Sequence, residues 1–337
     1  MKKLLFISIL CGLTVAAYAQ SDVMTATLQH GNETTVFKSA NALVQAYAAA
    51  VDGDVITLSD GNFAPVSISK SIKIYGAGFE ADPETGTAIT QINGAFDIGV
   101  ADATLADVHL EGLLVNGQIY GATVSPGSTT AQLQNCVIKK CRMTNLSFNS
   151  NIENVSVEQC YIVNNISAND QVVATSLMIA NCYIGGQIRT FNTQSTILVN
   201  HSIICGETSG GANCAYTYTN SILAMNIPWS YSTVCGENCV LRNCIVLGQK
   251  YGAGTITENI YVVAINNVFA DGTNAAYSAE RTWELTQPDM WVGTDGTPIG
   301  PTGGLTWNKV PGTPVVKNLQ LNVDGNTLKV NYEAEVR

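Results

Sequence analysis

The chain has 337 residues, of which only 12% are charged, with a net charge of -10 and a pI of about 4.7. A sparse and acidic surface argues against the binding of nucleic acid and against the unaided binding of polyanions. The length is ample for a large hydrophobic core.

The first predicted element is a secretory signal peptide over residues 1–19. Lys2 and Lys3 precede an apolar run, and Ala17-Tyr18-Ala19 has the small residues of a cleavage site. The run is too short for a membrane span, and no later segment is long and apolar enough to form one. We therefore predict export to the periplasm, the cell surface or the extracellular medium, and no membrane span.

Residues 20–54 are predicted to form an N-terminal hairpin and a capping helix. The hairpin turns at Gly31-Asn32 between alternating residues. The helix begins at Ser39 or Asn41, carries an apolar stripe, and ends at the sequence DGD of 52–54. Such a helix covers the first coil of a stack, which would otherwise expose its core.

A six-residue pattern recurs within residues 55–304. It reads LQNCVI at 133–138 and returns as VEQCYI, IANCYI, LVNHSI and LRNCIV. The central residues are 19 to 24 positions apart, a period typical of a solenoid. The aligned central positions are Asn135, Gln159, Asn181, Asn200, Asn220, Asn243 and Asn266.

Apolar residues alternate on both sides of this central position but change phase there, which predicts strand, bend, strand. Asn tolerates the left-handed conformation of such a bend, and its amide can bond to the equivalent amide one coil away. The pattern predicts roughly ten coils between Val55 and Ala275, with Ile138, Ile162 and Ile184 stacked in one column. The predicted structural ladder consists of Asn135, Asn181, Asn200, Asn220, Asn243 and Asn266.

Small residues follow the central position and are predicted to be buried beside the bend, mostly as thiols. Metal binding is the alternative, although these residues are spread over successive coils. Disulfides are favoured off the stack, between Cys205 and Cys214 or between Cys235 and Cys239, and a zinc site within 235–244 is the alternative there. The residues after the central position are Cys136, Cys160, Cys182, His201, Ser221, Cys244 and Asn267.

These features resemble a known family. ALVQAYAAAVDGDVITLSDGNF (42–63), followed by ISKSIKIYGAG (68–78), resembles the opening of a right-handed parallel β-helix of the pectate-lyase-like superfamily. The repeated pattern resembles the coil of that superfamily, and WELTQPDMWVGTDGTPIG (283–300) is similar to the closing segment of secreted bacterial β-helix proteins. The resemblance covers most of 42–304 and implies an all-β, right-handed parallel β-helix.

Residues 305–337 are predicted to end in a β-hairpin around Asp324-Gly325. The hairpin either packs back on the solenoid or holds a partner. Edge strands at a chain end are a plausible surface for self-association.

No catalytic cluster is evident in the sequence. Lyases that resemble this fold hold calcium with several carboxylates, and hydrolases need paired carboxylates. We therefore predict no catalytic residues and no metal, with calcium as a cofactor only if the protein is a lyase. The acidic residues within the repeats are scattered singly: Glu153, Glu158, Asp170, Glu207 and Glu237.

Aromatic residues provide the candidate ligand site. Tyr161 and Tyr183 stand two positions after the central residue on successive coils, and Trp229 and Tyr231 lie in the sequence NIPWSYS. Such rings can stack on sugars, whereas the alternative is that they pack against a loop crossing the surface.

Three hypotheses follow. The first is a non-catalytic exported protein that binds a polysaccharide or cell-surface glycan, or serves as a structural module. The second is a polysaccharide lyase or glycoside hydrolase with an unrecognised site, and the third is an adhesin-like or assembly component that uses the C-terminal hairpin.

Overall fold

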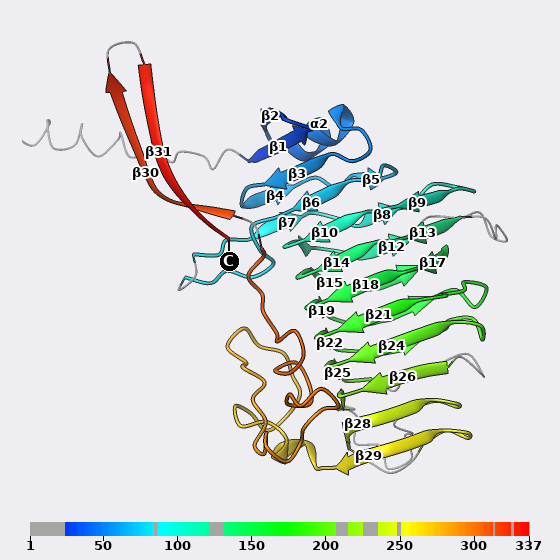
Figure 1. Cartoon of the computed structure of the whole chain (residues 1–337). Coiled ribbons are helices and arrows are strands. Elements are labelled where there is room, and N and C mark those ends of the chain that lie inside the picture. The colour runs from blue at the N-terminus through cyan, green and yellow to red at the C-terminus, as the bar shows by residue number, and fades with distance from the viewer. Residues whose placement is uncertain are drawn as a thin grey trace, which may run out of the picture.

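The computed structural model describes residues 24–83, 86–121, 131–206, 215–224, 235–247, 251–312, 314–324 and 327–336. The predicted signal peptide, 1–19, lies outside these residues. Within them the protein is an all-β stack of short, mostly parallel strands with one α-helix (Figure 1). This arrangement is consistent with the predicted β-solenoid.

The N-terminal end of the stack is closed by a hairpin and a helix, as the sequence predicts. Strands β1 (Thr25–His30) and β2 (Glu33–Lys38) pair antiparallel through a two-residue turn. Helix α2 (Ala42–Ala49) buries Leu43 and Ala46 and contacts β1, β2 and the first parallel strand. The helix therefore covers core side chains that no further coil would cover.

A sheet of 20 strands runs the length of the stack and contains two ladders, which merge in β28. Beyond β1 and β2, the first ladder contains β3 (Val55–Leu58), β6 (Lys73–Tyr75), β10 (His109–Glu111), β14 (Val137–Lys139), β18 (Val155–Glu158), β21 (Leu177–Ala180), β24 (Thr196–Asn200), β26 (Ala215–Thr219), β28 (Val240–Val246) and β29 (Ile256–Val262). The second ladder contains β4 (Gly61–Phe63), β7 (Thr90–Ile92), β11 (Leu114–Val115), β15 (Arg142–Met143), β19 (Tyr161–Ile162), β22 (Tyr183–Ile184), β25 (Ile203–Ile204) and β27 (Ile222–Leu223).

Two smaller parallel sheets form other sides of the stack. The six-stranded sheet contains β5 (Ser67–Ile68), β8 (Phe96–Ile98), β12 (Ile119–Gly121), β16 (Leu146–Phe148), β20 (Ile166–Ala168) and β23 (Ile188–Arg189). The three-stranded sheet contains β9 (Thr104–Ala106), β13 (Gln132–Gln134) and β17 (Asn151–Glu153).

The core consists of columns of inward side chains in register across successive strands. Each such aliphatic side chain contributes roughly 1.5–3 kcal/mol on burial, so these columns dominate stability. In the first ladder the buried column is Leu110, Ile138, Val157, Ile179, Val199, Tyr218 and Leu241.

The predicted register was wrong for the first repeat. Ile162 lies opposite Ile184 as predicted, but Ile138 lies opposite Val157 rather than Ile162. LQNCVI belongs to an earlier bend of the coil, at which Asp107, Asn135 and Asn154 are all left-handed, with φ between 51° and 59°. Two bends of one coil carry the same local pattern, so the pattern alone does not distinguish them.

The remaining repeats share a second bend, between the two ladders. Eight residues in register there have φ between 46° and 73°, which Gly and Asn adopt most readily. We call them the turn column: Gly112, Lys140, Gln159, Asn181, His201, Asn220, Asn243 and Asn259.

Asn181, Asn220 and Asn243 therefore occupy the predicted bend, but Asn135, Asn200 and Asn266 do not. Asn200 ends β24, and the left-handed residue of that coil is its neighbour His201. Asn266 lies in the short helix η1 (Ile265–Asn267). The predicted amide ladder is therefore not continuous, because its residues lie at two different bends, at a strand end and in η1. Amides of neighbouring coils do bond in separate pairs: Asn220 Nδ2 donates to Asn200 Oδ1 at 3.1 Å and Asn154 Nδ2 donates to Asn135 Oδ1 at 2.8 Å.

Residues 263–312, which we call the return segment, run back along the stack from its far end (Figure 1). Beyond them, β30 (Pro314–Asp324) and β31 (Thr327–Val336) pair antiparallel, in agreement with the predicted terminal hairpin. Among the described residues these two strands pair only with one another.

Candidate functional site

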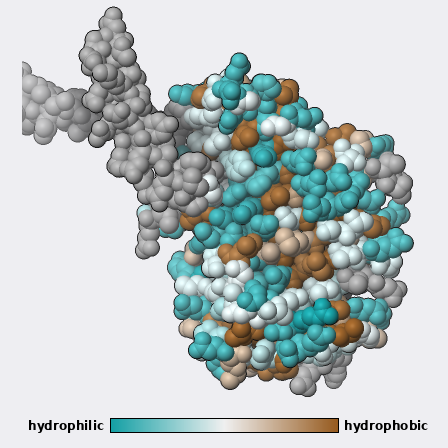
Figure 2. Space-filling view, viewed as in Figure 1, coloured by the Kyte–Doolittle hydropathy of each residue, from teal (hydrophilic) through white to brown (hydrophobic). Residues whose placement is uncertain are grey.

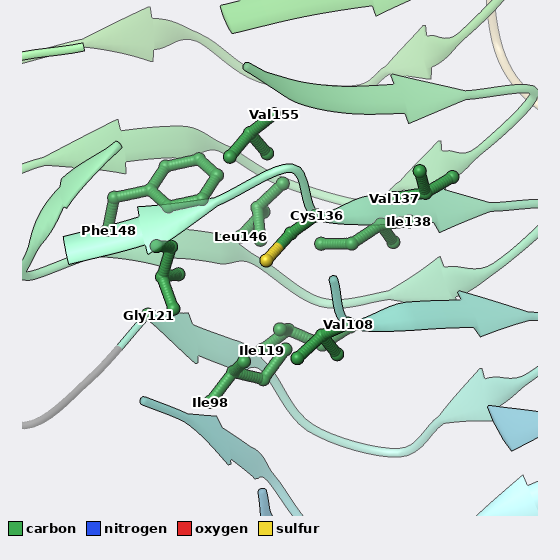
Figure 3. A pocket seen from close by; sticks show the side chains of 11 residues that line it. Ile98, Val108, Ile119, Gly121, Cys136, Val137, Ile138, Leu146, Phe148 and Val155 are labelled. Carbon is green, nitrogen blue, oxygen red and sulfur yellow. The ribbon is translucent and has the colours of Figure 1, made fainter. Parts of the chain in front are cut away.

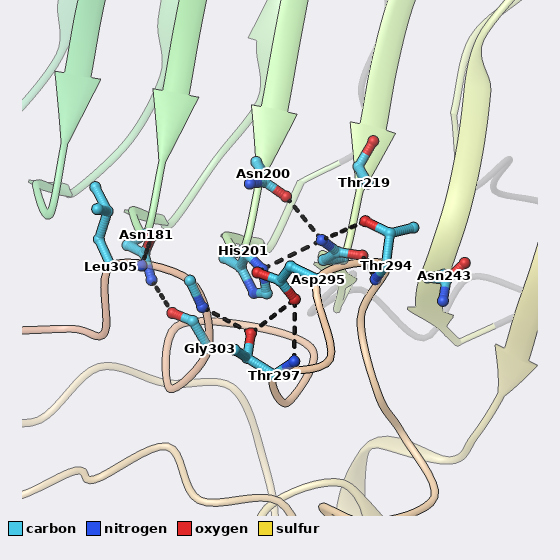
Figure 4. A network of polar contacts seen from close by, with 12 residues as sticks. Asn181, Asn200, His201, Thr219, Asn243, Thr294, Asp295, Thr297, Gly303 and Leu305 are labelled. Atoms are coloured by element: carbon cyan, nitrogen blue, oxygen red, sulfur yellow. Dashed lines mark hydrogen bonds and ion pairs between the residues drawn. The ribbon is translucent and has the colours of Figure 1, made fainter.

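The turn column holds the return segment against the stack (Figure 4). Side chains at the bend point outward and bond to the passing backbone. Asn181 illustrates this: its Nδ2 donates to Pro301 O at 3.0 Å and to Gly303 O at 2.7 Å. Equivalent contacts join Lys140 to Val310, Gln159 to Thr306, Asn220 to Thr294 and Asn243 to Val292.

His201 is the fully buried member of this column. Its Nε2 lies 2.9 Å from Asp295 Oδ2 and its Nδ1 lies 3.2 Å from Gly300 O. Asn220 Nδ2 lies 3.2 Å from the same Nε2, so the ring contacts both the return segment and the next member of the turn column. Asp295 also accepts from Thr297 Oγ1 at 2.8 Å, and the His201 ring is fully buried. We therefore assign His201 and Asp295 to attachment of the return segment rather than to catalysis.

A thiol and hydroxyl column lies beside the bend, inside the core. The Cys160 N–H donates to Cys182 Sγ at 3.4 Å, and the Cys182 N–H donates to Ser202 Oγ at 3.0 Å. Each thiol in turn donates to a backbone carbonyl, as Cys160 does to Glu158 O at 3.3 Å. The small residues that were predicted to fill the core beside the bend thus also form hydrogen bonds with backbone N–H and C=O groups there. The column contains Cys141, Cys160, Cys182, Ser202, Ser221 and Cys244, so Cys136, His201 and Asn267 were misplaced.

The eight cysteines among the described residues are all thiols. Burial raises the pKa of Cys136 to about 11 and that of Cys244 to about 12, so both stay protonated and can donate. The predicted disulfide between Cys235 and Cys239 is not formed, and a side-chain hydrogen bond from Cys239 lowers the pKa of Cys235. The predicted partner of Cys205, Cys214, lies outside the described residues.

Tyr161 and Tyr183 are covered by the return segment. The Tyr161 ring stacks on Tyr277 at 3.8 Å between centroids, and Tyr183 stacks on Trp283 at 5.3 Å. Tyr183 is buried, donates to Ala275 O at 2.7 Å, and has a pKa raised by desolvation. The geometry therefore matches the alternative in which these rings pack against a crossing segment, not an open sugar platform.

Two residues of the predicted ligand site cannot be placed. Trp229 and Tyr231 are outside the described residues. Among those described, no group of three or more potential ligands is arranged to hold a metal ion, and no helix is long and apolar enough to cross a membrane.

An open polar surface lies on the six-stranded sheet, where sequence reasoning placed no site. Its strands are only two or three residues long, so each contributes one outward side chain and no recognisable alternation. Ser67 and Arg189 are exposed and the residues between them are half-buried. We call this register the polar strip: Ser67, Asp97, Tyr120, Ser147, Ser167 and Arg189.

The polar strip is held in register by a second set of amides that the sequence analysis missed. Asn145 Oδ1 accepts the Asn165 N–H at 3.2 Å, and Asn165 Oδ1 accepts the Gln187 N–H at 2.8 Å. Asn145, Asn165 and Gln187 each lie five or six positions after a residue of the turn column. This regular spacing is visible in the sequence and could have identified them. Ser147 and Ser167 contact one another through their hydroxyls at 3.3 Å.

A small hollow inside the stack is a packing defect rather than a ligand site. Its walls are apolar side chains from several coils, including Ile119, Leu146 and Phe148 (Figure 3). The space is barely large enough for one water molecule and offers that water almost no polar partner.

Comparison of the chain with protein-family models, with curated proteins and with solved structures returned no match. Its function is therefore inferred from its own geometry.

Proposed function

We propose that the protein is an exported, right-handed parallel β-helix of roughly ten coils, similar to the pectate-lyase-like superfamily, which binds a polysaccharide or cell-surface glycan without cleaving it. The polar strip is the observation that carries this proposal. It presents hydroxyls, a carboxylate, a guanidinium and one aromatic ring in a straight row.

The chemistry of the strip suits a sugar chain. Strands stack about 4.8 Å apart, so its side chains repeat at a spacing comparable with one sugar residue. Tyr120 can stack on one sugar ring, and Asp97 on the neighbouring strand can bond to sugar hydroxyls beside it. Arg189 lies three strands beyond Tyr120 and can bond to a sugar residue further along the chain. One carboxylate and one guanidinium cancel in charge, which favours a neutral glycan.

The strip supports binding better than cleavage. Hydrolysis of a glycosidic bond uses two carboxyl groups about 5–10 Å apart. The strip itself contributes one carboxyl group, that of Asp97, and its other members are three serines, one tyrosine and one arginine.

The test is binding of the full exported chain to a panel of neutral and acidic polysaccharides, by affinity electrophoresis and calorimetry. Tyr120→Ala should weaken binding at least about tenfold, the equivalent of 1.4 kcal/mol. Tyr75→Ala, a half-buried tyrosine of the first ladder, is the matched control. Failure of every polysaccharide to bind would overturn the proposal, and release of reducing or unsaturated ends would establish a hydrolase or lyase instead.

A second candidate function, assembly through the C-terminal hairpin, has its own observation. The return segment carries the chain back along the stack to β30 and β31, whose outer edges pair with no other described strand. Unpaired edges are templates for strand addition. Proline substitutions on these edges should abolish self-association if the hairpin mediates it.

A further inference from the structure

An aliphatic stripe lies on the outward face of the first ladder. Met178, Leu198 and Ile256 are 41%, 44% and 54% exposed. Hydrophobic residues lie exposed among hydrophilic ones over the stacked strands (Figure 2). The seven positions in register are Val137, Ser156, Met178, Leu198, Thr217, Val240 and Ile256. Five of these seven residues are aliphatic, and Ser156 and Thr217 interrupt the stripe. Exposed apolar side chains gathered along one face mark an interaction surface.

A charged column runs parallel to the stripe, two residues further along each strand. Lys139 and Glu158 lie 3.6 Å apart near one end, and Arg242 and Glu258 lie 2.9 Å apart at the other. The positions between them are uncharged. From β14 to β29 the column reads Lys139, Glu158, Ala180, Asn200, Thr219, Arg242 and Glu258. The preceding position, Glu111 on β10, is buried and accepts a hydrogen bond from the Gly312 N–H, so it does not belong to the exposed column.

The order of charges is self-complementary. Read from one end it is positive, negative, three neutral positions, positive, negative. Reversing the order places Lys139 opposite Glu258 and Glu158 opposite Arg242, with Asn200 at the centre. The same reversal leaves the stripe opposite itself, with Leu198 at the centre.

We propose that two copies of this chain dimerise face to face through this surface. The two-fold axis lies in the interface, parallel to β24, and passes over Leu198 and Asn200. Such an axis keeps each column opposite itself while reversing coil order, as an isologous interface requires. Lys139 then meets the partner's Glu258, and Glu158 meets the partner's Arg242. An axis along the stack instead would place equivalent coils together and lose this match, so the charges select the orientation.

The size of the face sets the expected strength. Seven strands at about 4.8 Å span about 29 Å, so the contact falls at the small end of specific interfaces. Apolar burial along the stripe supplies the attraction, at roughly 25 cal/mol per Å². The exposed charge pairs add mainly orientation and association rate.

The first test measures the mass of the exported chain in solution by light scattering and sedimentation. The expected species is a dimer, and a monomer at every concentration would overturn the proposal. Leu198→Arg puts two cations together at the axis and should weaken dimerisation more than about tenfold. Leu305→Arg, at a leucine of the return segment that is 59% exposed, should leave the dimer intact. A Leu198→Arg dimer as tight as the wild type would also overturn it.

A second test is independent of whether Leu198→Arg folds. The four changes Lys139→Glu, Glu158→Lys, Arg242→Glu and Glu258→Arg preserve both pairs within the chain and the self-complementary order. This variant should form homodimers but not mixed dimers with differently tagged wild-type chain, because like charges then meet. Mixed dimers in the statistical proportion would refute the proposed axis.

Discussion

Two outward faces of the same long sheet differ in exposure: one is covered by the chain itself and the other is open. The second ladder presents Tyr161, Tyr183 and Ile203, and the return segment covers them with aromatic rings. The first ladder presents Met178 and Leu198, which the described chain leaves exposed. An apolar outward column therefore does not by itself mark a ligand site, because the chain can cover it with its own later residues.

The largest expected effect comes from removing the cover. Trp283 is 1% exposed and stacks on Tyr183, so Trp283→Ala should lower the free energy of unfolding by about 3–5 kcal/mol. Denaturant titration measures this change. Trp307→Ala, at a half-buried tryptophan of the same segment, should cost clearly less. Equal losses for the two variants would mean that Trp283 is not the principal anchor.

A smaller loss is expected at the attachment itself. Asn181→Ala removes the bonds to Pro301 and Gly303 and places alanine at a φ of 50°, which together should cost about 2–4 kcal/mol. Asn181→Gly removes the same bonds but tolerates the left-handed backbone. It should retain about 1 kcal/mol more stability than the alanine variant in the same titration, and a less stable glycine variant would contradict this account.

Acid should loosen the covered face through Asp295. Desolvation opposes its ionisation, but bonds from Thr297 and the charge of His201 prevail, and the pKa of Asp295 is lowered from 3.8. A carboxyl group whose pKa is lower in the folded than in the unfolded chain stabilises the fold at pH values above its unfolded-state pKa. This stabilisation is lost as the pH falls through its folded-state pKa. Asp295→Asn should therefore lose stability at about pH 6 but little at about pH 2, measured by thermal unfolding. An equal loss at both pH values would exclude the ionic contribution.

The smallest effect is expected on the open face. Leu198 is exposed in the single chain, so Leu198→Ser should change the stability of the monomer, measured at high dilution, by no more than about 0.5 kcal/mol. Ile203→Ser, on the covered face, is the contrasting variant and should cost several times more. Similar losses at both sites would remove the distinction between the two faces.

Much of the fold could be predicted because the required information is local. Alternation of residues such as Val157 and Ile179 marks inward columns, and Asn181 and Asn220 mark bends by their backbone preference. The same local argument failed at Asn135 and Asn200, since one coil contains more than one bend and Asn suits several positions. The hairpin at β1 and β2 needed only its own two-residue turn.

The polar strip and the dimer face could not be predicted in this way. Strands β12 and β16 are too short to show alternation, so Tyr120 and Ser147 meet only through the register of the whole stack. The proposed contact of Lys139 in one copy with Glu258 in the second likewise rests on the order of the strands in space, not on the spacing of these residues in the sequence.

The sequence by itself determined that this protein is a stack of short strands with aliphatic columns inside, because burial of alternating side chains is a property of neighbouring residues. Only the tertiary structure decided which outward face is covered and which is open. Tyr183 is buried by contacts such as its bond to Ala275, 92 residues away. No local pattern encodes a contact of that separation, because it depends on the path by which the return segment crosses the finished stack.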